Sequence, residues 1–158
     1  MAIKKNSTRK SPKKKPCKIN GRRVESNIVK GLSKVKHPLY IFRFNENRRN
    51  PTPADIYLST PKYNVLVEVK ATMRGKIQKG NIRKKQIERM TAFQDINDSN
   101  ISLVCLYFSG KIALVNVESI KELKSSITFV QAKEAGLEVI DWNQINRYLA
   151  RLKIKNSA

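Results

Sequence analysis

Val65-Leu66-Val67-Glu68-Val69-Lys70 is a short apolar run that ends in an acid and a base. Because side chains alternate between the two faces of a β-strand, the valines share one face. Leu66, Glu68 and Lys70 share the other face, so two charges lie side by side on a strand otherwise suited to burial. Buried charges cost stability unless they are paired or hold a metal ion. The run therefore predicts either a salt bridge on a half-exposed strand or a metal-binding site.

A second strand, with one carboxylate, lies upstream of this run. Residues 53–58 (Pro-Ala-Asp-Ile-Tyr-Leu) read as a strand, and the turn-rich residues 59–64 would return the chain as a hairpin. In such a hairpin Asp55 would face Glu68 across the ladder, close enough for both to share one divalent cation. Mg²⁺ prefers oxygen ligands and keeps several waters, so one or two carboxylates and a substrate phosphate suffice to bind it.

Carboxylates that bind Mg²⁺ can support phosphodiester hydrolysis, which needs a positioned water and neutralisation of charge on the phosphoryl oxygens. Asp55 and Glu68 fit the role of ligands, and the carbonyl of Val69 could add a third oxygen. Lys70 would point into the same pocket, where it can stabilise the phosphorane-like charge and help to orient or deprotonate the attacking water. Glu25, on the first predicted helix, would complete the metal shell or bind a second ion.

The chain is strongly basic, with 33 Lys and Arg residues against 12 Asp and Glu residues and a net charge of +21 over 158 residues. Such a field suits a polyanion, because Lys and Arg that neutralise phosphates drive nucleic-acid binding. An anionic membrane surface is the rival partner, although no run approaches the roughly 18 apolar residues of a transmembrane helix. We therefore expect DNA as the partner and no membrane span, in a protein of one domain.

The cysteine and histidine content bounds the compartment and the metal chemistry. Cys17 and Cys105 read as free thiols of a reducing compartment, and His37 is the only histidine, so no cysteine–histidine zinc spacing exists. The basic N-terminus is not followed by an apolar segment, so no secretory signal is expected. These features are typical of a cytoplasmic protein of a bacterial, archaeal or viral system.

Charge also predicts the domain boundaries. Residues 1–20 carry eight Lys or Arg and no acid, which is typical of a disordered basic arm. The arm would attach the protein to nucleic acid, or serve as a solubilising or localisation tail. Residues 21–152 would form the candidate nuclease domain, and residues 153–158 a C-terminal tail.

Hydrophobic periodicity predicts an α/β fold, a central mixed sheet of about five strands flanked by helices. Helices are expected over residues 21–36, 82–96, 118–125 and 141–152, and strands over residues 38–44, 53–58, 65–70, 101–108 and 111–117. Ser109-Gly110 would form a tight turn between the last two strands. Residues 45–53 are expected to form a polar loop and residues 73–81 a flexible basic loop.

Basic and aromatic side chains outside the carboxylate cluster each allow two interpretations. The basic residues are candidate phosphate contacts or ordinary solvated charges: Arg48, Arg49, Arg74, Lys76, Lys79, Arg83, Lys84 and Lys85. The aromatic residues read as core in preference to base-stacking platforms, because they fall on predicted buried faces: Phe42, Phe44, Phe93, Tyr107, Phe108 and Trp142.

Four short motifs follow one another in a distinctive order. Gly21-Arg22-Arg23-Val24-Glu25 opens the first helix, and Thr52-Pro53-x-Asp55 precedes the second strand. After a gap of twelve residues from Asp55 comes Glu68-Val69-Lys70-Ala71-Thr72, and residues 85–90, with Gln86, begin the next helix. This order resembles the PD-(D/E)xK nuclease superfamily and, within it, the Holliday-junction resolvases of the archaeal Hjc and bacterial RecU types. Residues 136–140 (Gly-Leu-Glu-Val-Ile) are similar to the late strand of the RecU type.

The resemblance implies a restriction-endonuclease-like fold, Mg²⁺ as cofactor with Mn²⁺ as a substitute, and symmetric cleavage of four-way DNA junctions by a homodimer. It also implies a site role for Gln86, which would orient the water or a phosphate, whereas by itself Gln86 reads equally well as a polar helix-surface residue. Two features depart from the pattern. Ala54 separates Pro53 from Asp55, and residues 45–52 are too short for the junction-inserting stalk of RecU proteins.

Three functions remain open at this point. The most specific is a metal-dependent, structure-selective DNA endonuclease that resolves four-way junctions by paired phosphodiester hydrolysis. A restriction-like or nicking endonuclease that acts on duplex DNA is the alternative among enzymes. A non-catalytic basic nucleic-acid-binding protein is the alternative that the net charge supports without any contribution from the carboxylates.

Overall fold

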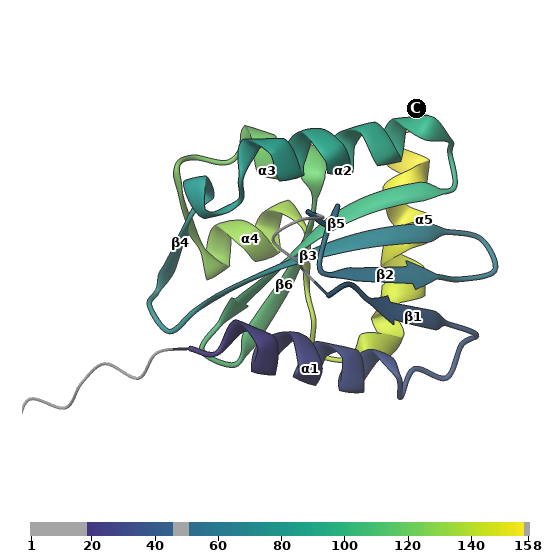
Figure 1. Cartoon of the computed structure of the whole chain (residues 1–158), viewed down its shortest axis with the longest axis horizontal. Helices are drawn as coiled ribbons and strands as arrows, with labels where there is room; N and C mark the ends of the chain where they lie inside the picture. The colour runs from purple at the N-terminus through teal and green to yellow at the C-terminus, as the bar shows by residue number, and fades with distance from the viewer. Residues whose placement is uncertain (1–18, 46–50, 157–158) are drawn as a thin grey trace, which may run out of the picture.

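A computed structural model of the chain describes residues 19–45 and 51–156. Within these ranges the main sheet has six strands in the order β1-β2-β3-β5-β6-β8, and a separate small sheet pairs β4 with β7 (Figure 1). The strands are β1 Tyr40–Arg43, β2 Ile56–Ser59, β3 Asn64–Thr72, β4 Lys76–Gln78, β5 Asn100–Phe108, β6 Lys111–Asn116, β7 Ser126–Thr128 and β8 Leu137–Glu138. The predicted mixed sheet is confirmed, with one strand more than expected.

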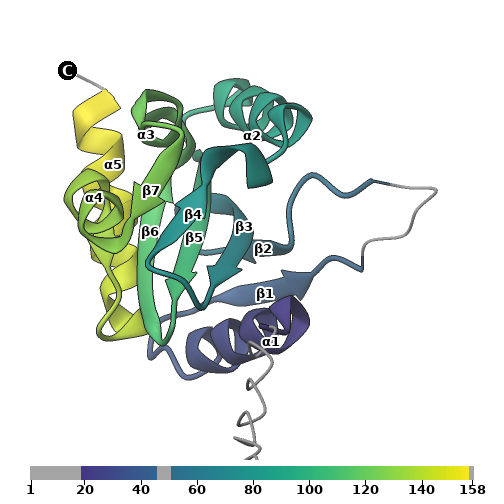
Figure 2. The ribbon, with the colours of Figure 1, turned by 90° about the vertical axis from the view of Figure 1, so that its left-hand side faces the viewer.

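Helices cover both faces of the main sheet and make a layered α/β fold. They are α1 Gly21–Leu32, α2 Lys84–Ile96, α3 Val117–Glu122, α4 Phe129–Ala135 and α5 Ile145–Asn156, with 3₁₀ turns at Lys79–Asn81 and Trp142–Gln144. Apolar side chains of α1 and α5 pack on one face, and those of α2, α3, α4 and the small sheet pack on the other. Figure 2 shows α2 and α3 on the side of the sheet opposite to α1. None of the described helices is both long and apolar enough to cross a membrane.

The centre of the sheet is the parallel pair of β3 and β5, in which Val67 lies beside Leu103. The other neighbouring strands of the main sheet run antiparallel. Because the two central strands are covered on both faces, they carry nearly continuous apolar sequence, including the buried Cys105. Parallel strands need a crossover, which here runs through α2. The predicted turn after β5 is confirmed, since Ser109 and Gly110 both have positive φ, at 48° and 99°.

Helix α1 forms because Val24, Ile28 and Leu32 recur at helical spacing and are buried together against the sheet. The side chain of Asn20 caps its first turn by accepting a hydrogen bond from the Arg23 N–H. The helix ends at Leu32, four residues before the predicted end. The chain turns there, and Pro38 disfavours helical backbone at the residue that precedes it.

Three other expectations about elements were wrong. Residues 73–81, expected as a flexible loop, contain β4 and a 3₁₀ turn, because Ile77 pairs with Ile127 of β7 and both are buried. Helix α4 follows β7, where no helix was predicted. Helix α5 begins at Ile145 and continues to Asn156, so it extends into the segment 153–158 that was expected to be a tail.

We predict that Gly31→Ala destabilises the protein although alanine is the better helix former. A Cβ at position 31 would lie 2.4 Å from Cδ1 and Nε1 of Trp142, so α1 would be forced away from the start of α5. The free energy of unfolding should fall by about 1–3 kcal/mol, as for overpacking in other cores, in urea denaturation.

Gly21→Ala is the matched control in the same helix, because a Cβ at position 21 meets nothing within 4 Å. This control should leave stability unchanged or raise it slightly. Equal stabilisation by both substitutions would contradict the close packing of α1 on Trp142.

Candidate active site

The pairing of β2 with β3 ends with Ile56 opposite Val67, so the next residues along the two strands, Asp55 and Glu68, come close together, as the hairpin predicted. Asp55 is the residue immediately before β2, and its backbone forms hydrogen bonds to the chain segments on both sides. Its N–H donates to the carbonyl of Val67 at 3.1 Å, and its carbonyl accepts from the N–H of Phe44 at 2.9 Å. Its side chain turns toward β3, where Oδ2 accepts a hydrogen bond of 2.7 Å from the N–H of Val69. The carboxylate therefore has one defined position.

Glu68 is a charged residue in the middle of the sheet, with only 1% of its surface exposed. Its Oε1 is 2.6 Å from Nζ of Lys70 and accepts a hydrogen bond of 2.9 Å from Nε2 of Gln86. Burial excludes the reading of Glu68 and Lys70 as a salt bridge on a wet strand face. The structure thus brings Asp55, Glu68, Lys70 and Gln86 together.

Gln86 reaches the site from the first turn of α2. Its Oε1 accepts from the N–H of Arg83 at 3.2 Å, which closes the start of the helix, while its amide nitrogen donates to Glu68. A single side chain therefore caps α2 and contacts the buried carboxylate. The reading of Gln86 as a mere surface residue does not hold.

Burial, and after it the negative charge of Glu68, raise the pKa of Asp55 from 3.8 to about 7. The hydrogen bond from the Val69 N–H and the charge of Lys70 act in the opposite direction but are outweighed. A divalent cation beside the two carboxylates would offset both the cost of burying the Asp55 charge and its repulsion by Glu68. The donor set, two carboxylates and a backbone carbonyl, consists of the hard oxygens that Mg²⁺ prefers.

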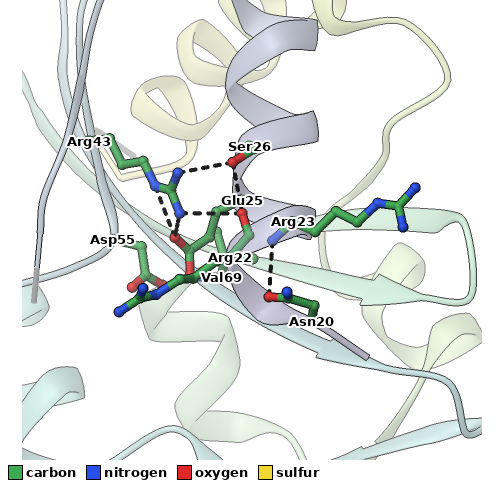
Figure 3. Close-up of polar contacts among 8 residues, drawn as sticks. All are labelled: Asn20, Arg22, Arg23, Glu25, Ser26, Arg43, Asp55 and Val69. Atoms are coloured by element: carbon green, nitrogen blue, oxygen red, sulfur yellow. Dashed lines mark hydrogen bonds and ion pairs between the residues drawn. The ribbon is translucent and has the colours of Figure 1, made fainter. Parts of the chain in front are cut away.

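Glu25 does not join Asp55 and Glu68 in one cluster, contrary to the prediction of a three-acid metal shell. Its Oε2 accepts hydrogen bonds from Nε and Nη2 of Arg43, at 3.1 and 2.5 Å (Figure 3). Within residues 19–45 and 51–156, no three acidic, histidine or cysteine side chains lie close enough to hold a metal ion together. The negative charge of Glu25 still contributes to the raised pKa of Asp55. Glu25 therefore borders the site without being a ligand in this arrangement.

Arg43 is the site-bordering residue that the sequence reasoning missed. Besides Glu25 it contacts Ser26, whose Oγ accepts from Nη1 at 3.0 Å, so it ties β1 to the start of α1. Alternation along the strand offered a signal, because Arg43 shares a face with Ile41, which packs into the core beneath α1. A charge on such a face demands a counterion, and Glu25 is the acid that α1 supplies.

The predicted DNA contacts fall into three groups. Arg74, Lys76, Arg83, Lys84 and Lys85 are exposed, as a phosphate-binding role requires. Lys79 is engaged by the protein itself, since its Nζ donates to the carbonyl oxygens of Lys121 and Leu123 at 2.5 and 2.9 Å. Arg48 and Arg49, like residues 1–18 of the basic arm, lie outside the described residues.

Comparison with solved structures identifies a relative in fold. The chain is similar to Hjc from Archaeoglobus fulgidus, a Holliday junction resolvase from an archaeal hyperthermophile, with a TM-score of 0.60. The match covers 79% of this chain and 98% of that chain at 16% sequence identity. Comparisons with protein-family models and with curated proteins find no match. The fold implied by the motifs is therefore confirmed: the chain has the α/β fold of this resolvase.

We predict that Asp55→Asn stabilises the metal-free protein at neutral and alkaline pH. The folded-state pKa of about 7 lies above the ordinary value of 3.8, so folding takes up a proton between these values and stability falls as the pH rises through them. Asparagine removes this penalty and keeps the acceptor for Val69. In EDTA at pH 8, the free energy of unfolding of the variant, measured by urea denaturation, should be higher than that of the unsubstituted protein by up to about 4 kcal/mol. At pH 4 the two proteins should be about equally stable.

Asp95→Asn, on the exposed surface of α2, is the control and should change stability little at either pH. Added Mg²⁺ should raise the melting temperature of the unsubstituted protein at pH 8 more than that of Asp55→Asn. A variant that is less stable than the unsubstituted protein at pH 8 would contradict the raised pKa.

We also predict a measurable coupling between Glu25 and Arg43. A double-mutant cycle with Glu25→Ala and Arg43→Ala should give about 0.5–1.5 kcal/mol, because the pair is half-buried and makes two hydrogen bonds. The exposed pair Lys84–Glu88, at 3.9 Å, is the matched comparison and should couple by about 0.5 kcal/mol at most. Equal coupling in the two cycles would mean that Arg43 does not hold Glu25 in solution.

Proposed function

We propose that this chain is a metal-dependent, structure-selective DNA endonuclease that resolves four-way junctions by paired phosphodiester hydrolysis. One observation carries the proposal: a fully buried glutamate faces a second carboxylate and contacts a lysine, in a strongly basic chain. A purely structural ion pair would not need Asp55, whose carboxylate makes the site more costly to bury. The fold similarity to an archaeal resolvase supports the same reading.

The residues divide the chemistry among them. Asp55, Glu68 and the carbonyl of Val69 would hold Mg²⁺, or Mn²⁺ in its place, which when bound supplies Lewis-acid stabilisation of the phosphoryl charge. Lys70, whose side chain is 23% exposed, presents its ammonium at the edge of the site, where it can neutralise a phosphoryl oxygen and orient the attacking water. Gln86 holds the Glu68 carboxylate in place and offers its amide to the water or phosphate.

The DNA would lie across the open side of this site. Arg83 precedes α2, and Lys84 and Lys85 begin it beside Gln86. Arg74 precedes β4, and Lys76 is its first residue. These five side chains would contact phosphates. The basic arm, residues 1–20, would add sequence-independent attachment. Symmetric cleavage of a junction needs two active sites, so we infer a homodimer as the working form.

We predict that Glu68→Gln abolishes Mg²⁺-dependent cutting while junction binding survives. The amide keeps the size of the side chain but removes the charge that would hold the cation, and a loss of at least about 10³-fold in rate is expected from the removal of such electrostatic stabilisation. Cleavage should be followed on labelled four-way junction, linear duplex, flap and single strand, with Mg²⁺ and Mn²⁺.

Glu88→Gln is the control, because Glu88 is an exposed acid of α2 whose ion-pair partner is Lys84. Its cutting rate should match that of the unsubstituted protein. Unchanged cleavage by Glu68→Gln would refute the assigned site. Equal cutting of duplex and junction would favour the restriction-like alternative, and the absence of scission with either metal would leave a non-catalytic binding protein.

A further inference from the structure

Strand β1 exposes two large aromatic side chains beside the candidate site. Tyr40 is 63% exposed and Phe42 is 48% exposed, whereas Phe42 was expected in the core. The prediction failed because β1 is the outer strand of the sheet. Its alternate residues, Ile41 and Arg43, face α1, so Tyr40 and Phe42 lie on the opposite face.

The opposite face of β1 is left open by the helices. Helix α2 packs over β5 and touches β3 through Gln86 and Glu68. Figures 1 and 2 show β1 at the margin of the sheet, away from α2. No other described helix covers this face of β1, so the two rings are accessible from solvent.

The exposed aromatic side chains and the catalytic carboxylates share one face of the sheet. Phe42 pairs with Tyr57, which in turn pairs with Leu66 of β3. Two residues along the strands, the next row on this face contains Asp55 and Glu68. Two strand spacings and two residue steps place Phe42 roughly 12 Å from Glu68. That is a few base steps of DNA, whose rise is about 3.4 Å.

Chemistry favours nucleobases as the occupant of this surface. The described residues around the rings on the same face are neutral. The ring of Phe44 packs edge-on against that of Phe42, and Tyr57, Ser59 and Asn64 are joined by hydrogen bonds through Oδ1 of Asn64. No acid lies among them to repel a polyanion, and the chain as a whole carries a charge of +21. Exposed rings within a basic protein are the usual platform on which bases of unpaired nucleotides stack.

A second copy of the chain fits this surface less well. Stable dimers bury about 800 Å² on each partner. Two aromatic side chains supply roughly 500 Å² at most, even when they are covered completely. The patch is therefore too small to hold a dimer by itself, whereas one or two bases would cover it.

We propose that Tyr40 and Phe42 stack on bases whose faces come unstacked at the branch of the DNA substrate, a few nucleotides from the scissile phosphate. The inference rests on the proposed nuclease function and adds to it a means of preferring branched over continuous DNA. Linear duplex has its bases stacked internally and offers none to the rings. The platform therefore contributes to junction affinity and not to duplex affinity.

The test measures binding in EDTA, so that no cleavage occurs, with full-length protein on a four-way junction and on a duplex of matched length. Phe42→Leu and Tyr40→Leu should each weaken junction binding about fivefold or more, with duplex binding changed by less than about twofold. Phe42→Tyr should retain junction affinity. Val130→Ala, which trims an equally exposed apolar side chain of α4, should bind as the unsubstituted protein does.

Photo-crosslinking gives a direct readout. A junction with 5-iodouracil at the branch should crosslink to position 40 or 42 on irradiation, as mapped by mass spectrometry, and a duplex with the same label should not. Sedimentation of each variant, and its urea denaturation, checks assembly and folding. Equal losses for junction and duplex, unchanged junction affinity in both variants, or no crosslink at these positions would overturn the inference.

The outcomes separate this inference from the function on which it rests. If the unsubstituted protein cuts junctions with Mg²⁺ and Phe42→Leu binds them normally, only the stacking platform is refuted. If the unsubstituted protein neither cuts nor prefers junctions, the nuclease proposal itself fails. A variant that becomes monomeric while the unsubstituted protein is dimeric would assign the rings to a contact between copies, which also overturns the inference.

Discussion

The site depends on one constraint, the burial of Glu68 in the middle of the sheet. The charge of a carboxylate with 1% exposure must be compensated by other groups, and these come from β3 itself and from α2. Lys70 does so from the same strand, and Gln86 ties the first turn of α2 to it. Asp55 makes the burial of Glu68 more costly, because its position next to Glu68 at the end of the β2–β3 pairing brings a second negative charge close to the first. The hairpin, the central strand and α2 therefore meet at one charged group.

Two ion pairs lie in or beside the site, and they have different structural roles. Glu68 and Lys70 lie on the same strand, so their pairing is fixed by strand geometry. Glu25 and Arg43 come from α1 and β1 and hold those elements together. Asp55 has no such cationic partner at hydrogen-bonding distance among the described residues, and its burial and the nearby charge of Glu68 raise its pKa. An arrangement selected for stability alone would omit this carboxylate, whereas an arrangement that binds a cation requires it.

Local alternation in the sequence predicted the carboxylate pair because strand period and a short hairpin set its geometry. The pairing of Glu25 with Arg43 was beyond such reasoning, since it depends on how α1 packs across β1. The exposure of Phe42 was misjudged for a related reason: a strand pattern shows which residues share a face but not which face the helices cover. Strand β4 was missed because Ile77 alone marks it, in an otherwise basic segment, and its partner lies fifty residues away.

Helix α2 is held on the sheet by directional hydrogen bonds in addition to apolar packing, and these bonds bear on the site. Helices α1 and α2 both pack through apolar side chains, but α2 is also held by hydrogen bonds from buried residues of β5: Ser102 Oγ donates to the carbonyl of Met90 at 2.6 Å, and Asn100 donates to that of Phe93 at 2.8 Å. Apolar contacts tolerate small slides along a helix axis, but directional hydrogen bonds do not. Gln86 must reach Glu68 at 2.9 Å, so the axial position of α2 matters. The buried polar residues of β5, which weaken its apolar pattern, thereby position the end of α2 that carries Gln86.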